Sequence, residues 1–344
     1  MMEFSNNFKS KTSKEKIFKK YMWILVVFIA ILIISILSIR YGSVRYSVNE
    51  ILRGIFIRDN KKITSVIFDI RLPRLLISIF VGANLSIAGV LLQAVMANPL
   101  ADPGVTGVSS GASLMAVIIL IIFPQFSSFL PIVAFIGAII TCVLVYTLAF
   151  QGGIKPMRIV LAGIAINTLL SSVTSLLFML FSDQIQGVVS WLNGSLANKT
   201  WSTLNIIIPY SLIGLALSIF CAKGCNVLAL GDDMAKSLGI NVTLVRIFVS
   251  AEACFLAAIS VSNVGLIGFV GLIVPHISRM IIGYDHKFLI PFSALLGAAV
   301  LSLADLLSRA LFAPIEIPVG IVMSTLGVPF FLYIMRKGGK KIGE

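Results

Sequence analysis

The chain alternates between long apolar runs and short polar segments, and this pattern predicts membrane-spanning helices. A helix needs roughly 17–25 mostly apolar residues to cross a bilayer, and the runs predict about ten such spans. They lie at 22–39, 75–96, 107–123, 129–150, 158–181, 203–222, 246–263, 264–282, 291–307 and 317–335. Glycine and Pro275 interrupt the eighth run, so it is the least regular span.

The segment between the second and third spans contains a break in the helical pattern. Asn98-Pro99 and Asp102-Pro103-Gly104 follow one apolar run, and the next run begins after Gly107. Proline lacks a backbone N–H and disfavours helix in the residue before it. Such a break must lie at a membrane face or be enclosed by protein. The residues alone are also compatible with a plain turn between two helices.

Composition supports the membrane assignment. The chain is 58% hydrophobic and 12% charged, with a mean hydropathy of +1.04. The predicted fold is an all-α polytopic membrane protein, with residues 1–344 forming a single domain. The net charge of +13 does not indicate nucleic-acid binding, because the basic residues lie in termini and loops. The four cysteines are expected to be small buried hydrophobic residues, and two histidines are too few for a metal site.

The basic residues also predict the orientation in the membrane. A lysine-rich tail at 1–21 precedes the first run, and most other basic loops fall on the same side, which predicts that both termini are cytoplasmic. The first run is long for a signal peptide and no cleavage site follows it. The polar connection at 40–74 is the exception, since it places a basic patch on the outer face. Spans two to five and seven to ten have opposite orientations, which predicts an inverted repeat.

The sequence contains no recognisable catalytic, metal-binding or nucleotide-binding motif. It has no nucleophile–base set, no cluster of metal ligands and no phosphate-binding Gly-x-x-x-x-Gly-Lys loop. We therefore expect no catalytic residue, no bound metal and no cofactor. A pump built on this chain would need a partner that binds ATP and Mg²⁺.

Polar and small residues share one helical face in two of the spans. These are Gly82, Ser86, Gly89 and Gln93 in the second span, and Gly163, Asn167, Ser171 and Thr174 in the fifth. Such a face can pack closely against another helix or can line a water-filled path. Both interpretations stay open.

Acidic residues at membrane depth are few. Asp305 and Arg309 are four residues apart and are predicted to pair near the outer end of the ninth span. Glu252 lies two turns into the seventh span, either as a proton site or as a carboxylate near the interface. Between the sixth and seventh spans, the loop at 223–245 predicts a short helix, with Asp232 and Asp233 at its N-terminus and Gly239 at its end.

Several sequence blocks together resemble the permease subunits of ATP-binding-cassette (ABC) importers for iron–siderophore complexes, heme and cobalamin. The blocks include Arg71-Leu72-Pro73-Arg74 and Asn98-Pro99-Leu100-Ala101-Asp102-Pro103. Others lie at 191–196, 230–242, 268–279, 283–287, 304–309, 316–320 and 325–329. They cover the chain from about residue 70 to 335.

The resemblance implies roles for individual residues. A coupling segment that docks on an ATPase would comprise Gly231, Asp232, Asp233, Ala235, Leu238 and Gly239. The external binding protein would dock at Arg71, Arg74 and Arg309. The translocation path would include Ser86, Gln93, Asn167 and Ser171, with a cytoplasmic gate at Lys155 and Pro156. Lys-Pro departs from the small hydroxyl residues expected at that gate.

The resemblance also implies an assembly: two permeases, identical or paralogous, two ATPases that bind ATP and Mg²⁺, and an extracytoplasmic substrate-binding protein. We therefore expect a permease in a bacterial cytoplasmic membrane that imports an iron–siderophore complex, with heme or cobalamin as alternatives within the family. The alternative outside it is a secondary transporter that uses Glu252 or Asp305 as a coupling carboxylate. A membrane enzyme is a third class, which the missing catalytic set disfavours.

Overall fold

The protein is a bundle of long helices. The computed structural model describes residues 2–42, 44, 46–47, 50, 61–311 and 313–338, and within them the only β-type pairing is one isolated bridge between Phe150 and Ile154. The first half of the bundle contains α1 (Met2–Arg40), α3 (Lys61–Ser65), η1 (Val66–Arg71), α4 (Leu72–Val95), η2 (Pro103–Thr106), α5 (Val108–Ile121), η3 (Pro124–Phe129), α6 (Leu130–Ala149) and α7 (Pro156–Leu180). The second half contains η4 (Ser182–Gln184), α8 (Ile185–Leu192), α9 (Trp201–Leu228), α10 (Asp232–Ser237), α11 (Val242–Val264), α12 (Val270–Ile282), α13 (His286–Ala310) and α14 (Val319–Gly338).

The predicted spans are confirmed as helices. Seven helical segments in the described part of the chain are long and apolar enough to cross a membrane, and α5, α12 and α14 are shorter apolar helices. Together they match the ten predicted runs. The all-α polytopic class that the hydropathy pattern predicts is therefore confirmed.

Several boundaries differ from the sequence prediction. Helix α1 begins at Met2, well before residue 22, and the chain is helical from Lys61, so the connection is shorter than 40–74. The eighth span begins only at Val270, because Gly265 and Phe269 have positive φ angles of 80° and 67° that a right-handed helix cannot contain. The short helix α8 was not predicted.

Helix α4 is the centre of the bundle. Its small residues allow close approach: a Cβ atom on Gly82 would lie 2.3 Å from the carbonyl oxygen of Gly297 in α13. Polar side chains add cross-links, since Asn84 Nδ2 donates to Ser211 Oγ of α9 at 2.7 Å. Helix α4 is therefore mostly buried in protein although its hydropathy is that of a membrane span.

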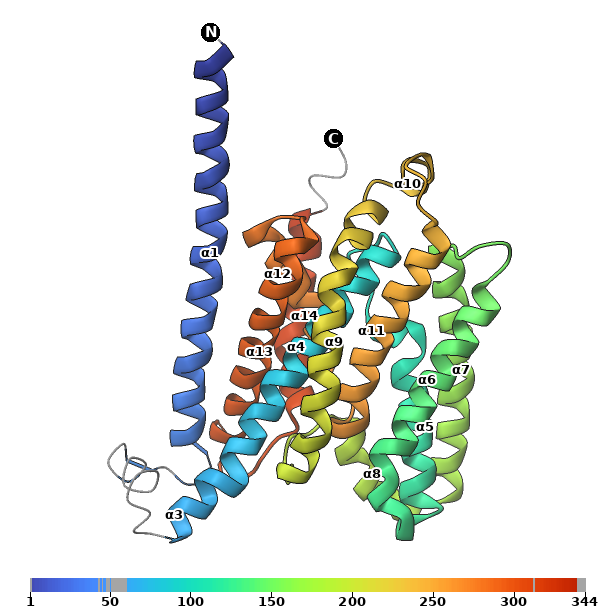
Figure 1. The fold of residues 1–344 in the computed structure, drawn as a ribbon. Coiled ribbons are helices and arrows are strands. Elements are labelled where there is room, and N and C mark those ends of the chain that lie inside the picture. The colour runs from blue at the N-terminus through green and yellow to red at the C-terminus, as the bar shows by residue number, and fades with distance from the viewer. Residues whose placement is uncertain are drawn as a thin grey trace.

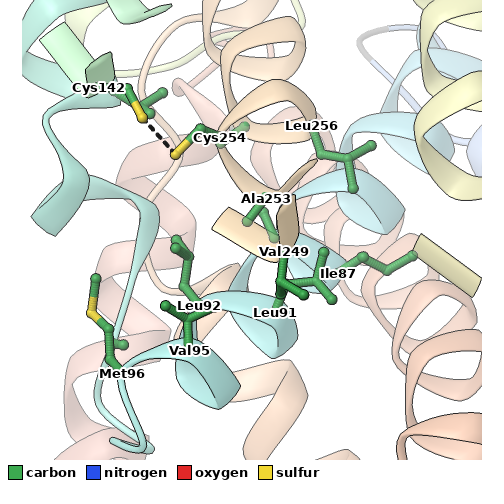
Figure 2. Close-up of a cluster of buried hydrophobic side chains, with 14 of the residues drawn as sticks. Ile87, Leu91, Leu92, Val95, Met96, Cys142, Val249, Ala253, Cys254 and Leu256 are labelled. Carbon is green, nitrogen blue, oxygen red and sulfur yellow. Dashed lines mark hydrogen bonds between the residues drawn. The ribbon is translucent and has the colours of Figure 1, made fainter. Parts of the chain in front are cut away.

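The largest apolar core lies where α4, α6 and α11 meet. Figure 2 shows Leu91 and Leu92 of α4 beside Val249 and Ala253 of α11, all of them buried. The Cys142 and Cys254 thiols face each other 2.9 Å apart (Figure 2). All four cysteines are free and buried, as the sequence predicts.

The two ends of the bundle differ in what they carry. Helix α10, the start of α1 and the end of α14 lie at one end, which we call the α10 end; α3 and α8 lie at the other, the α8 end (Figure 1). The α7 helix lies at the side of the bundle and exposes Leu161, Ile164, Leu169 and Leu176.

The order of the helices bears on the predicted repeat. In each predicted repeat the first long helix is followed by a break and then by a short helix: α5 follows α4, and α12 follows α11. This order supports an inverted repeat, which remains a prediction.

Candidate functional site

The two helix breaks meet inside the protein. One break is the segment 97–107 before α5, and the other is the segment 265–269 before α12. They share a cavity of about 90 Å³ lined by Leu85, Asp102, Pro103, Ser109, Val261, Leu266, Ile267, Gly268 and Gly271. Irregular backbone at membrane depth is tolerated where it is enclosed by protein or lines a cavity. The sequence-predicted break is thus a packed structural element.

The first break is held by its own side chains. The Asp102 carboxylate accepts a hydrogen bond from the Gly104 amide at 2.8 Å, and Asn98 Oδ1 accepts one from the Leu100 amide at 2.9 Å. Both are local turns that Asp and Asn form readily ahead of proline or glycine. Gly107, the N-cap residue of α5, has a φ of 83°, and a Cβ atom there would also lie 2.6 Å from Thr141 Cγ2. Glycine is required there on both grounds.

A larger polar cavity, which we call the α5–α7 cavity, lies beside the two breaks. Its volume is about 360 Å³, and its lining is Gly104, Ser109, Ser110, Ser113, Asn167, Ser171, Thr174, Ser175 and Leu266. Asn167 organises its wall, because its Nδ2 donates to the Gly104 carbonyl at 2.9 Å and its Oδ1 accepts from Ser110 Oγ at 2.6 Å. Helices α5 and α7 therefore present a hydroxyl-rich surface beside the breaks.

The predicted path residues divide into two groups. Asn167 and Ser171 line the polar cavity. Ser86 does not, since it is fully buried and donates to the Ser293 carbonyl of α13 at 2.7 Å. Gln93 is also buried, donates to the Gly271 carbonyl at 3.1 Å and accepts from Arg279. In this conformation the polar face of α4 packs against helices, because α4 is surrounded by its own chain.

The serines of α5 are site residues that sequence reasoning missed. Ser109, Ser110 and Ser113 follow the break at Gly107 and line the cavity. The available signal was their position: three hydroxyls within the first turns of a helix that starts at a glycine break.

The predicted gate is part of a tight loop at the α10 end. Gly152 and Gly153 have φ angles of 66° and 144°, and the bridge between Phe150 and Ile154 closes the turn. Lys155 is exposed and Pro156 is the first residue of α7. We call residues 150–156 the hairpin loop.

The predicted coupling segment forms one short helix, α10. Ala235 is fully buried against the bundle, whereas Leu230, Met234 and Leu238 are all more than half exposed. Met234 and Leu238 are four residues apart and lie on one face of the helix, whereas Leu230 precedes the helix, on the other side of Gly231. Gly231 and Gly239 flank the helix with φ angles of 89° and 76°. The next helix, α11, begins at Val242, directly after this segment.

Arg246 joins the coupling segment to the hairpin loop. Its Nη1 and Nη2 donate to the two carboxylate oxygens of Asp232 at 2.9 and 2.8 Å. Nη1 also donates to the Ile154 carbonyl at 2.9 Å. The Arg246 side chain is 5% exposed and the Asp232 side chain 40% exposed, so a buried arginine holds a carboxylate at the surface through two parallel hydrogen bonds. From the sequence, Arg246 was only one of the basic residues that predict the orientation of the chain in the membrane.

The three predicted docking arginines are all buried near the α8 end. Arg74 Nε lies 2.9 Å from Asp305 Oδ1, and its Nη1 lies 2.7 Å from Glu316 Oε2. Arg309 Nε lies 3.2 Å from Asp305 Oδ2, so the predicted pairing of Asp305 and Arg309 is present. Arg71 instead donates to backbone carbonyls at the end of α1: Ile39 at 2.5 Å, Arg40 at 3.1 Å, and Val44 beyond it.

Glu252 lies against α9 rather than in the polar cavity. It is buried, and its Oε1 has no hydrogen-bond partner among the described residues. A Cβ on Gly214 would lie 3.1 Å from that oxygen. In the described part of the chain no group of three or more His, Cys, Asp or Glu residues could hold a metal ion.

Comparison with known proteins agrees with this architecture. The model of the FecCD transport family matches residues 29–337. The chain is 42% identical to the Fe(3+)-citrate import system permease protein YfmD of Bacillus subtilis, over 85% of this chain and 87% of that protein. It is 40% identical to the cobalamin import system permease protein BtuC of Halobacterium salinarum, over 79% and 73%.

A solved structure shares the fold as well. A chain of a metal-chelate type ABC transporter in an inward-facing conformation superposes with a TM-score of 0.82 at 30% identity, covering 91% of this chain and 98% of that one. The broken helices, the polar cavity and the sequence blocks therefore occur in a chain whose length and fold match a known group of permeases. The chain belongs to the FecCD transport family.

Proposed function

We propose that the chain is the membrane-spanning permease subunit of an ABC importer that moves an iron–siderophore complex. The observation that carries the proposal is the hydroxyl-rich cavity at the meeting point of two broken helices, on the same chain as an exposed apolar coupling segment. Relatives named for iron citrate, iron hydroxamate and cobalamin import support the substrate class.

We propose a bacterial cytoplasmic membrane in which the α10 end faces the cytoplasm. The lysine-rich start of α1 and the end of α14 lie at that end (Figure 1), where the positive-inside rule places basic residues. The α8 end would then face outward.

The proposed assembly contains three kinds of partner. A second permease, identical or paralogous, would cover α7, which exposes Leu161, Leu169 and Leu176 and also carries Asn167 and Ser171 of the polar cavity. Two ATPases, which bind ATP and Mg²⁺, would dock at α10. A substrate-binding protein would dock at the α8 end near Arg71, Arg74 and Arg309. Because these arginines are already bonded within the chain, docking would have to add acceptors to them or exchange their present partners.

The contacts suggest how ATPase movement would reach the path. A displacement of α10 would pull on Asp232 and hence on Arg246, which holds the Ile154 carbonyl of the hairpin loop. That loop leads directly into α7 at Pro156, and α7 carries Asn167 and Ser171 on the cavity wall. Movement at α10 would thus bias which side of the cavity is open, through differential contacts in two states.

Reconstitution tests this function. The permease would be purified with its ATPases and binding protein and placed in proteoliposomes with a labelled ferric siderophore. We expect uptake that requires ATP, stops with vanadate and survives an uncoupler. Uptake that ignores vanadate and collapses with the uncoupler would support the secondary-transporter alternative instead.

A further inference from the structure

Pro275 leaves a gap in the hydrogen bonding of α12. The helix runs from Val270 to Ile282 and contains Pro275 in its interior. Proline has no backbone N–H, so it cannot donate to the carbonyl four residues earlier, which is that of Gly271. Gly271 is buried. A buried carbonyl without a donor destabilises the fold, so this turn needs a donor from elsewhere in the protein.

Gln93 of α4 supplies this donor. Its Nε2 donates to the Gly271 carbonyl at 3.1 Å, and the residue is 4% exposed. Helix α4 can come this close because residue 89, one turn earlier, is glycine: a Cβ atom there would lie 2.0 Å from the same carbonyl oxygen. Small residues at helix contacts in membranes allow such an approach, and polar ones bond across them. Gly89 therefore provides the space and Gln93 the hydrogen bond.

Arg279 fixes the orientation of the Gln93 amide. Its Nη2 donates to Gln93 Oε1. A guanidinium group only donates, so the amide oxygen must face Arg279 and the amide nitrogen is left to face Gly271. Gly271 precedes Pro275 by four residues, and Arg279 follows it by four. The amide thus bonds α12 on both sides of the proline.

The same side chain also reaches the first break. Gln93 Nε2 lies 3.4 Å from the Ala101 carbonyl oxygen, to which its second N–H can donate. The start of α12 lies directly against this break, because a Cβ atom on Gly271 would be 3.3 Å from Pro103 Cδ. Gln93 therefore joins three elements at one point: α4, α12 and the first break.

We propose that Gln93 is a positioning residue for transport, which replaces the hydrogen bond that Pro275 removes and so fixes α12 to the first break. It acts through backbone carbonyls and Arg279 rather than by touching the substrate. A proline inside a helix is a point of bending, and this contact sets where α12 lies on both sides of it. The role in transport rests on the proposed function, whereas the contact rests on the bonds of the Gln93 amide.

The distance between α12 and the first break tests the contact without any transport. Spin labels at Leu100→Cys in the break and Met280→Cys in α12 use exposed positions, and the four native cysteines are buried. For the purified full chain in nanodiscs, we expect pulsed electron paramagnetic resonance to give one narrow distance distribution. Gln93→Met keeps the length of the side chain but removes its hydrogen bonds, so it should broaden that distribution.

Pro275→Ala tests the reason for the contact. Alanine restores an N–H that can donate to Gly271, so Gln93→Met should broaden the distribution far less in that background. Uptake by the reconstituted importer should follow the same pattern. We expect about a tenfold or greater loss for Gln93→Met alone, as an unsatisfied buried acceptor predicts, but a change within about twofold when it is added to Pro275→Ala. Such a double-mutant cycle measures how far one residue depends on the other.

Two further variants complete the comparison. Gln93→Glu keeps an acceptor for Arg279 but offers no donor to Gly271, so it should behave like Gln93→Met, and it replaces that variant if Gln93→Met does not fold. Ser86→Ala removes a different buried hydrogen bond of α4, the one to the Ser293 carbonyl of α13. Its effect should be the same with and without Pro275→Ala.

Three results would overturn the role of Gln93: an unchanged distance distribution in its variants, an equal effect with and without Pro275→Ala, or normal ATP-dependent uptake in Gln93→Met. The proposed function fails separately. A distance distribution that depends on both Gln93 and Pro275, in a protein without ATP-dependent uptake, would retain the contact and reject the importer.

Discussion

At the scale of single residues, Arg246 has the most consequential environment. Its guanidinium bonds a carboxylate of α10 and a backbone carbonyl of the hairpin loop at the same time. Lysine could not reproduce this arrangement, because an ammonium group lacks the planar fork that matches a carboxylate. The contact joins the segment proposed to meet the ATPase to the loop that starts α7.

Arg246→Ala should uncouple ATP use from transport. The change leaves Asp232 and the Ile154 carbonyl without their donor, and we expect uptake to fall by about tenfold or more, as hydrogen bonds to charged groups suggest. ATPase co-purification should persist, since the apolar face of α10 is unchanged. Uptake and ATP hydrolysis measured on the same proteoliposomes check this.

Arg158→Ala is the matched control for this prediction. Arg158 also donates to the hairpin loop, to the Gln151 carbonyl at 3.1 Å, but among the described residues it forms no hydrogen bond or ion pair with α10. Normal coupling in Arg246→Ala, or an equal loss in Arg158→Ala, would contradict the role given to Arg246.

Glu252→Gln distinguishes the possible energy sources. Glutamine keeps the size of the side chain and removes its ionisable proton, and no described group donates to Glu252 Oε1. An ATP-driven importer should therefore retain uptake within about a few-fold, whereas a proton-coupled carrier would lose accumulation. Accumulation measured at normal expression decides between them, and complete loss would contradict the importer.

At the scale of elements, the inner side of α10 packs against the bundle and its outer side is exposed. Ala235 packs the helix against the bundle, and the exposed Met234 and Leu238 give it an apolar outer face. Exposed apolar side chains grouped on one element mark interaction surfaces. The two sides can therefore be tested separately.

Changes on the outer face of α10 should abolish docking but not insertion. We expect Met234→Asp with Leu238→Asp to prevent ATPase co-purification while the permease keeps its yield and melting temperature. Ala235→Arg should also abolish uptake, but by displacing the helix, because its Cβ has no free space to grow into. Lys236→Ala, an exposed change on the same helix, is the control. Unchanged co-purification in the double variant would rule out this face as the docking surface.

At the scale of the whole molecule, buried charges tie distant parts of the chain together near the α8 end. Arg74 at the start of α4 bonds Asp305 of α13 and Glu316 ahead of α14, and Arg309 joins the same cluster. Breaking a buried pair by removing one partner is strongly destabilising, by roughly 3–5 kcal/mol. This cluster therefore contributes to folding as well as to any docking.

Arg74→Glu should lower both stability and partner binding. The change places a third carboxylate beside Asp305 and Glu316, so we expect a lower melting temperature together with weaker binding-protein affinity. Melting and nanodisc binding are measured on the same preparation.

Arg71→Glu serves as a comparison for Arg74, because the hydrogen bonds of Arg71 in the described structure go to backbone carbonyls, and its guanidinium lies over the Tyr46 ring rather than beside a carboxylate. It should destabilise the end of α1 without disturbing the Asp305 cluster. Normal partner affinity in both variants would remove these arginines from the docking surface.

The sequence by itself determined the spans and the helix breaks. Hydrophobic runs report directly on burial in lipid, and proline and glycine act on the local backbone, so neither depends on tertiary contacts. The break at Asn98–Gly107 and the position of α10 follow from such local signals. The observed ends of the spans differ from the predicted ones. The eighth span, for example, begins at Val270 instead of residue 264, because Phe269 has a positive φ.

Tertiary structure alone decided which polar residues line a cavity. Helical periodicity assigned Ser86 and Asn167 to similar polar faces, yet Ser86 packs on α13 while Asn167 lines the α5–α7 cavity. Periodicity identifies a face but not what lies against it. Likewise, Arg246 bonds Ile154 and Arg74 bonds Asp305, partners remote in sequence that only the packing of the helices brings within reach.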